Sequence, residues 1–238
     1  DSALEFAKAH PEIYTIHASG ASAWKDGKDY KGLPSLTNIM GRMEYGKMMA
    51  GCAAALTTKS GKIGYLGGQA LPFSYQEVHA IQQALADLGS DVELVYVWTG
   101  DFNDPTKARQ TADALIGQGV DVIMSSLNLG VYGVFEAAKA VTDKQILVTV
   151  KYTDKASYAP NNYVTSVIYD FAGPLQETIT KIQAGETGGY YPLGFATGVK
   201  LQLPLKNVDP AVQTQVEEIM GKVVDGTIAV VEDSTEIK

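Results

Sequence analysis

The chain has 238 residues, of which 45% are hydrophobic and 19% charged, and its formal net charge is −8. This length and balance fit one large or two small globular domains with a sizeable core. The acidic charge, with no run of Lys or Arg, argues against a nucleic-acid partner. A single cysteine, Cys52, excludes an internal disulfide and a cysteine-based zinc cluster, and we expect it to be a buried apolar residue. No apolar run reaches the roughly 18 to 20 residues that span a bilayer.

The first sixty residues predict few regular elements. The patterns favour a helix over 2–9, a short strand over 13–17, a solvated polar connection over 21–37, a strand over 38–43 and a helix over 45–58. The chain starts inside a helix pattern, so we expect a trimmed or incomplete amino terminus. Two strands are too few for a stable parallel sheet, so we expect 2–9 and 13–17 to pack against structure outside this numbering.

Strand and helix patterns alternate from residue 62 to residue 154. Strands are predicted at 62–66, 92–98, 120–124 and 146–150, and helices at 75–88, 105–117 and 131–141. The nearly continuous apolar run 92–98 predicts a strand that is covered on both faces. Asp104 followed by Pro105 predicts a capped helix start. Such units form a doubly wound parallel sheet, whose ligands bind outside the carboxyl ends of its strands.

The pattern changes after residue 154. A strand is predicted at 163–168, a helix at 171–184 and irregular or β structure at 190–203. Asp209 and Pro210 predict the start of a last helix that runs to about residue 225. The tail 226–238 is expected to add an edge strand.

Most local motifs do not indicate chemistry. The glycines of 64–68 follow a strand but do not form the dinucleotide-binding fingerprint. The three histidines are too scattered for a metal site by local spacing, and no serine occupies a nucleophile elbow. We therefore expect no metal, no cofactor and no catalytic residues. His17, at the carboxyl end of its strand, either lines a cleft or is a capped structural histidine.

Polar loops follow the central strands and form the candidate ligand site. Phe102 lies between Asp101 and Asn103 without an apolar neighbour, so it either folds back onto the core or presents its ring to a bound molecule. Asn128 and Asp154 each follow a strand, as a small polar ligand would require. Either Asp101 or Asp104 is able to cap the following helix, and Asp104 fits better.

Several stretches together indicate a family. They are Ile16–Gly20, Gly41–Glu44 with Ala50–Gly51, Thr58–Tyr65, Val97–Pro105, Gly119–Ile123, Tyr158–Pro160 and Val164–Ser166. In their order and spacing the chain resembles the basic membrane protein family over about residues 1 to 190. This family comprises purine-nucleoside-binding receptors of ABC importers with the type I periplasmic-binding fold.

The resemblance implies two α/β lobes with doubly wound parallel sheets and a ligand held between them. The first lobe would comprise 1–60 with 169–187 and would be amino-terminally incomplete. The second would comprise 61–168, with 188–238 packing on it or on the hinge. From the resemblance, Phe102 falls at the base-stacking aromatic, Asn128, Gly130 and Asp154 fall in ligand-facing loops, and Glu44 falls in the hinge-side segment. The full set of candidate ligand-binding residues adds three more: His17, Asp101 and Tyr152.

The resemblance also implies a purine nucleoside or nucleobase as ligand and an ABC permease as membrane partner. The protein would be a monomeric, non-catalytic, periplasmic or extracellular receptor, anchored as a lipoprotein in its full-length form. Two departures matter. The family's first three strands have no counterpart before Asp1, which leaves half a lobe unaccounted for, and Tyr169 stands where the family often has a lysine, which leaves the exact ligand open. The alternative is the effector-binding core of a cytoplasmic transcriptional regulator with the same fold, and an enzyme ranks third.

Overall fold

The computed structural model describes residues 2–19 and 32–237, which form two compact units. The first unit contains residues up to Met43 together with Tyr169–Val199, and the second contains Glu44–Ile168 with Lys200–Lys238. Most of the polar connection expected at 21–37 lies outside the described residues. Its end is described: the chain enters a strand at Leu36.

The first unit is a small parallel sheet with helices. Its elements are α1 (Ser2–Ala9), β1 (Thr15–Ala18), β2 (Leu36–Gly41), α7 (Ala172–Gln183) and β8 (Gly189–Leu193). Among the described strands the order is β1-β2-β8, with both pairs parallel. All six residues of β2 are buried, because this strand lies between the other two.

The second unit contains the larger sheet. Its elements are α3 (Met43–Thr57), β3 (Lys62–Gly67), α4 (Pro72–Asp87), β4 (Glu93–Trp98), α5 (Pro105–Gly117), β5 (Val122–Ser126), α6 (Val131–Ala140), β6 (Leu147–Tyr152), the 3-10 turn η2 (Ala156–Tyr158), β7 (Tyr163–Tyr169), β9 (Val199–Leu201) and α8 (Pro210–Val224). The sheet order is β4-β3-β5-β6-β7-β9, and the pairs from β4 through β7 are parallel.

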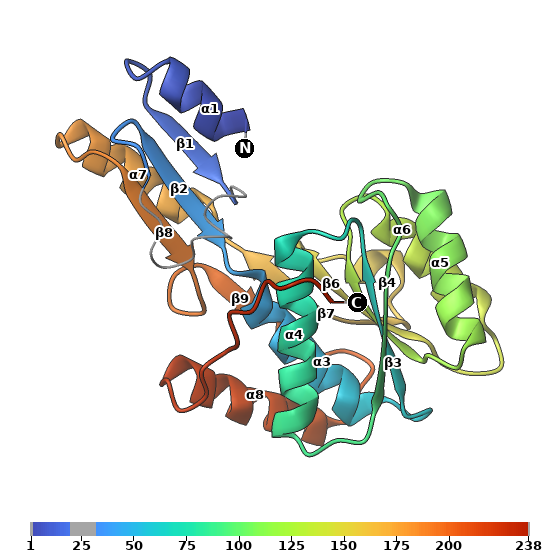
Figure 1. Cartoon of the computed structure of the whole chain (residues 1–238). Coiled ribbons are helices and arrows are strands. Elements are labelled where there is room, and N and C mark those ends of the chain that lie inside the picture. The colour runs from blue at the N-terminus through green and yellow to red at the C-terminus, as the bar shows by residue number, and fades with distance from the viewer. Residues whose placement is uncertain (1, 20–31, 238) are drawn as a thin grey trace. The chain divides into compact units, whose positions relative to one another are not determined.

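Helices cover both faces of this sheet, as the alternating sequence pattern predicts. In Figure 1, α5 and α6 lie on one side of the sheet and α3 and α4 on the other. The core beneath α5 and α6 includes Ile123, Val134, Phe135 and Val148, all of which are fully or almost fully buried. Because the strands are parallel, their carboxyl ends meet along one edge, where α3, α4, α5 and α6 also begin.

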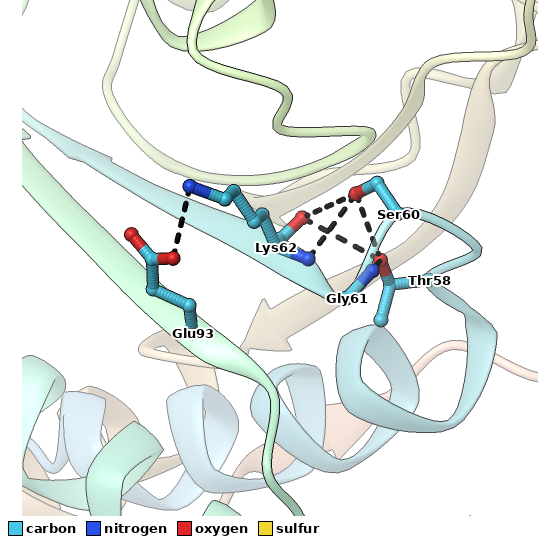
Figure 2. Close-up of polar contacts among 5 residues, drawn as sticks. All are labelled: Thr58, Ser60, Gly61, Lys62 and Glu93. Carbon is cyan, nitrogen blue, oxygen red and sulfur yellow. Dashed lines mark hydrogen bonds and ion pairs between the residues drawn. The ribbon is translucent and has the colours of Figure 1, made fainter.

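Local hydrogen bonds fix the starts of the elements. The carboxylate of Asp104 accepts hydrogen bonds from the N–H groups of Thr106 and Lys107, which confirms the predicted cap of α5, and Asp209 caps α8 in the same way. At the opposite edge of the sheet, Figure 2 shows the turn between α3 and β3. There Thr58 and Ser60 bond within the turn, and Lys62 Nζ lies 2.9 Å from Glu93 Oε2.

One local prediction holds only in part and another is wrong. The strand 92–98 has contacts on both faces, since Val95 and Val97 pack against the core beneath α5 and α6 and Trp98 meets Tyr75 of α4, but its residues are only half-buried or exposed, and β4 lies at an edge of the sheet. The tail adds no edge strand over 226–237. It instead runs along α4 (Figure 1), where Gln83 bonds the backbone of Ala229 and Val231, and His79 Nε2 lies 3.1 Å from the Thr235 carbonyl oxygen.

The unit boundaries differ from the expected lobes at two places. The expected first lobe included α3, but Glu44 and the rest of this helix fall in the second unit. Gly46 shows why: a Cβ there would lie 2.3 Å from Cγ1 of Val167 on β7, so α3 packs tightly on the larger sheet. The segment expected to follow the second lobe from residue 188 first forms β8, which pairs with β2 of the first unit.

Candidate functional site

The loops after β4 and β5 are joined at the carboxyl edge of the six-stranded sheet. The carbonyl oxygen of Phe102 accepts hydrogen bonds from the N–H groups of Asn128, at 3.0 Å, and Gly130, at 3.1 Å. A Cβ on Gly130 would lie 3.1 Å from that oxygen and 3.0 Å from Leu127, so glycine permits the close approach. The structure therefore brings together Phe102, Asn128 and Gly130, which the sequence placed in two separate loops.

The ring of Phe102 is half-buried. It packs against the core beneath α5 and α6, and it stacks on Phe73 with a centroid distance of 6.0 Å and an interplanar angle of 25°. Phe73 lies in the first turn of α4, at the same edge of the sheet. Phe102 thus folds back onto its neighbours and still keeps part of its ring accessible.

Asp101 and Asp154 use their carboxylates within the loops. The N–H of Asn103 donates to Asp101 Oδ1 at 2.7 Å, which forms a local turn. Asp154 accepts from the N–H of Ala156 at 2.8 Å and from Nε2 of Gln202 at 2.6 Å. These two bonds, that from Ala156 first, lower the pKa of the exposed Asp154 carboxyl. Both aspartates therefore stabilise the conformations of loops at the carboxyl edge of the sheet.

The other predicted site residues lie in different surroundings. Glu44 is fully buried in the first turn of α3. His17 belongs to β1 of the first unit and is half-buried, and burial lowers its pKa. Tyr152 ends β6 with a positive φ of 77°, which is uncommon for a residue other than glycine.

A network of buried polar side chains lies beneath this edge, on the side of the sheet that faces α3 and α4. The carboxylate of Glu77 on α4 accepts hydrogen bonds from the Tyr65 hydroxyl at 2.6 Å and the Ser126 hydroxyl at 2.5 Å. Its Oε1 lies 3.6 Å from Nζ of Lys151 on β6. Lys47 on α3 donates to the Ser125 carbonyl oxygen at 2.9 Å.

Burial shifts the pKa values of side chains in this network. It lowers the pKa of Lys47 to about 8, against the opposing attraction of Glu77, and it raises the pKa of Tyr65 well above its usual value, with Glu77 adding to the effect. Burial alone would lower the pKa of Lys151, but Glu77 and Tyr152 together raise it. A fully buried lysine or glutamate is rare unless it is paired. The Glu77–Lys151 pair satisfies that condition, and breaking it would cost about 3 to 5 kcal/mol.

Sequence reasoning missed this network, although signals for it were present. Glu77 falls on the α4 stripe formed by Ser74, Val78 and Ile81, all of which are buried. Lys151 directly follows the predicted strand 146–150 and lies near the end of β6. An ionisable residue on an apolar helix face or at a strand end indicates a partner in another element, and the sequence alone does not say which.

Exposed apolar side chains also occur in the loops at the carboxyl edge. Leu129, in the loop before α6, is 57% exposed, and Tyr158 is 53% exposed with its ring 4.6 Å from that of Tyr132 at the start of α6. A cavity of about 610 Å³ lies elsewhere, at the amino edge of the sheet between Asp121, Lys144 and Val212, and it shares no residue with the candidate site.

Comparison with known proteins identifies the family. The model of the family described as ABC transporter substrate-binding protein PnrA-like matches residues 2–234. The chain belongs to this PnrA-like family. This confirms the resemblance found in the sequence, and the family is described as one of substrate-binding proteins.

Individual relatives agree with this membership. Basic membrane protein B of Borreliella burgdorferi is 28% identical over 200 residues, which cover 82% of this chain and 58% of the relative. A purine-binding protein of Brucella abortus is 24% identical over 230 residues, which cover 96% of this chain and 61% of the relative. The chain therefore spans about three fifths of the length of these relatives.

A solved structure shows the same fold. The crystal structure of an ABC transporter solute-binding protein from Aeropyrum pernix K1 superposes with a TM-score of 0.80 at 21% identity, over 97% of this chain and 74% of that one. The expected α/β fold with parallel sheets is thereby confirmed. None of the helices in residues 2–19 and 32–237 has the length and hydropathy of a membrane span.

Proposed function

We propose that this PnrA-like protein is the ligand-binding component of an ABC importer and that it binds a purine nucleoside or a related nucleobase. Family membership supports the receptor role. The ligand class rests on one observation, the stacked and half-buried rings of Phe73 and Phe102 at the carboxyl edge of the larger sheet. Flat heterocycles stack on such rings, and parallel sheets bind their ligands at this edge.

Each residue at the edge has a role in this proposal. Phe102 stacks on the base, and the exposed Asn128 offers amide donors and acceptors to polar groups of the ligand. Tyr152 adds a ring with a hydroxyl. Gly130 and Asp154 hold the loops from which these side chains extend.

The cellular role follows from the same proposal. The receptor would work outside the cytoplasm, as a monomer, and would deliver its ligand to a membrane permease without covalent chemistry. A lipid anchor on the full-length protein would keep it at the membrane. The family match over 2–234 favours this role over the effector core of a transcriptional regulator.

Native mass spectrometry of the protein as purified tests the ligand class. We expect an added mass equal to that of a purine nucleoside or nucleobase, which is lost on mild denaturation and regained on adding adenosine, guanosine or inosine. Cytidine and ribose serve as matched controls, because they lack the purine ring. Retention of a sugar or an amino acid in place of a purine would reject the proposal.

A further inference from the structure

Lys151 is a buried cation whose ammonium group lies close to two aromatic rings. Its side chain is 2% exposed, and Nζ lies 5.6 Å from the ring centroid of Phe73 and 4.9 Å from that of Tyr152. Both distances fall within the range of cation–π attraction, which strengthens when the charge is removed from water. The carboxylate of Glu77, at 3.6 Å, supplies the opposite charge. Lys151 therefore links the buried network to the aromatic side chains at the edge.

The backbone of Tyr152 is held in an unfavourable conformation at this point. Neighbouring side chains on a strand point to opposite faces of the sheet, so a regular strand would separate the Tyr152 ring from Lys151. The positive φ of 77° breaks the alternation, and the ring lies over the lysine. Such a conformation is unfavourable for a residue other than glycine and persists only where surrounding contacts impose it.

The contacts continue from Lys151 to the surface proposed to bind the base. Phe73, which lies against the ammonium group, stacks on Phe102. The carbonyl oxygen of Phe102 in turn holds the loop of Asn128 and Gly130. Loss of the ammonium group would therefore leave Phe73 and Tyr152 without the charge that orients them, and Phe102 without a fixed neighbour.

We propose that Lys151 is a positioning residue for ligand binding, which orients Phe73 and Tyr152 so that a heterocycle meets a preformed aromatic surface. It acts through these rings and does not touch the ligand. The inference rests on the proposed function, because it assumes that a flat ring stacks at this edge. Preformed binding surfaces gain affinity because less ordering is needed on binding.

A double-mutant cycle tests this role. Lys151→Met alone would leave Glu77 unpaired, so the charge is removed with the double variant Lys151→Met/Glu77→Gln, which leaves no uncompensated carboxylate. We expect this variant to bind adenosine about tenfold more weakly in calorimetry. Phe73→Leu should weaken binding about fivefold when it is made in the wild-type protein. It should weaken binding less than about twofold when it is added to Lys151→Met/Glu77→Gln, because the Phe73 ring has already lost its orientation in that variant.

Stability measurements and a matched control separate positioning from general destabilisation. Lys62→Met removes another lysine ion pair of the same sheet at its amino edge, and its affinity should stay within about twofold of wild type. Unfolding in denaturant reports the stability of every variant. A purely structural role for Lys151 would make the effects of Phe73→Leu on affinity equal in the two backgrounds, which overturns the inference alone. A wild-type protein that binds no purine overturns the proposed function as well.

Discussion

The ring of Phe102 covers Gly68, where an added Cβ would lie 2.2 Å from Cδ1 of the ring. The sequence predicted an aromatic residue that either folds back onto the core or faces a ligand. The structure shows that the ring packs against the core and against Phe73 and that the residue is half-buried. This geometry makes separate predictions for removing the ring and for displacing it.

Removal of the ring tests stacking. We expect Phe102→Ala to weaken purine binding by about 1 to 3 kcal/mol, which is the range for a base that stacks on an aromatic side chain. Its loss of folding stability should be smaller than that of Phe135→Ala, because Phe135 is 1% exposed in the core and a buried Phe contributes about 3 to 5 kcal/mol. Calorimetry and chemical denaturation of the two variants provide the comparison. A stability loss as large as that of Phe135→Ala with unchanged affinity would place Phe102 in the core.

Displacement of the ring tests its position. Gly68→Ala puts a methyl group where the Phe102 ring now lies, so the whole ring must move, including its Cγ atom at 2.4 Å. We expect affinity for a purine to fall at least about threefold, with a loss of folding stability of about 1 to 3 kcal/mol from the steric conflict. Gly117→Ala serves as the control, since nothing lies within 4 Å of a Cβ there. Unchanged affinity in Gly68→Ala would show that the ring orientation does not matter.

At the scale of elements, the sequence predicted most helices and strands because their signals are local. The cap of Asp104, the proline after it and the apolar periodicity of α5 all lie within a few residues of one another. The edge position of β4 was missed because strand order depends on distant pairing, and an apolar run is compatible with an edge or a central position. The network of Lys47, Glu77 and Lys151 was missed for the same reason, since its members come from α3, α4 and β6.

The buried Lys47 makes a prediction about pH. Its pKa is about 8 in the folded protein against 10.5 for a free lysine, so the unfolded chain binds more protons than the folded chain between these pH values. Stability from this group therefore rises with pH across that window, by about 3 kcal/mol in total. Below pH 8 both states carry the proton, and the group contributes no slope.

Comparison with Lys47→Met isolates this effect from other titrating groups. We expect the free energy of unfolding of wild type, relative to that of Lys47→Met, to be constant from pH 6 to 7 and to rise between pH 8 and 10. Lys144→Met, at an exposed lysine, corrects for the loss of a charge in general. A difference that falls with rising pH would show that Glu77 stabilises the Lys47 ammonium group more than burial destabilises it.

At the scale of the whole molecule, the fold and the family could be predicted from the sequence, because stretches spread over the chain matched in order. The candidate site could be predicted only in part. The sequence placed Phe102, Asn128 and Gly130 in loops after neighbouring strands, and the structure joins these loops. The sequence contains no indication of Phe73 or Lys151, since nothing local to them shows that a cation lies beside a ring. The positive φ of Tyr152 could not be predicted from the sequence either, because a tyrosine does not indicate this backbone conformation.

Titration of the purified protein with nucleosides in a calorimeter tests the central claim most directly. We predict that adenosine, guanosine or inosine binds with one site per chain, and that cytidine and ribose bind far more weakly. The bound purine should also raise the free energy of unfolding, by about 2.7 kcal/mol at a concentration of one hundred times Kd. Absence of binding by every purine nucleoside and nucleobase to folded, ligand-free protein would contradict the account.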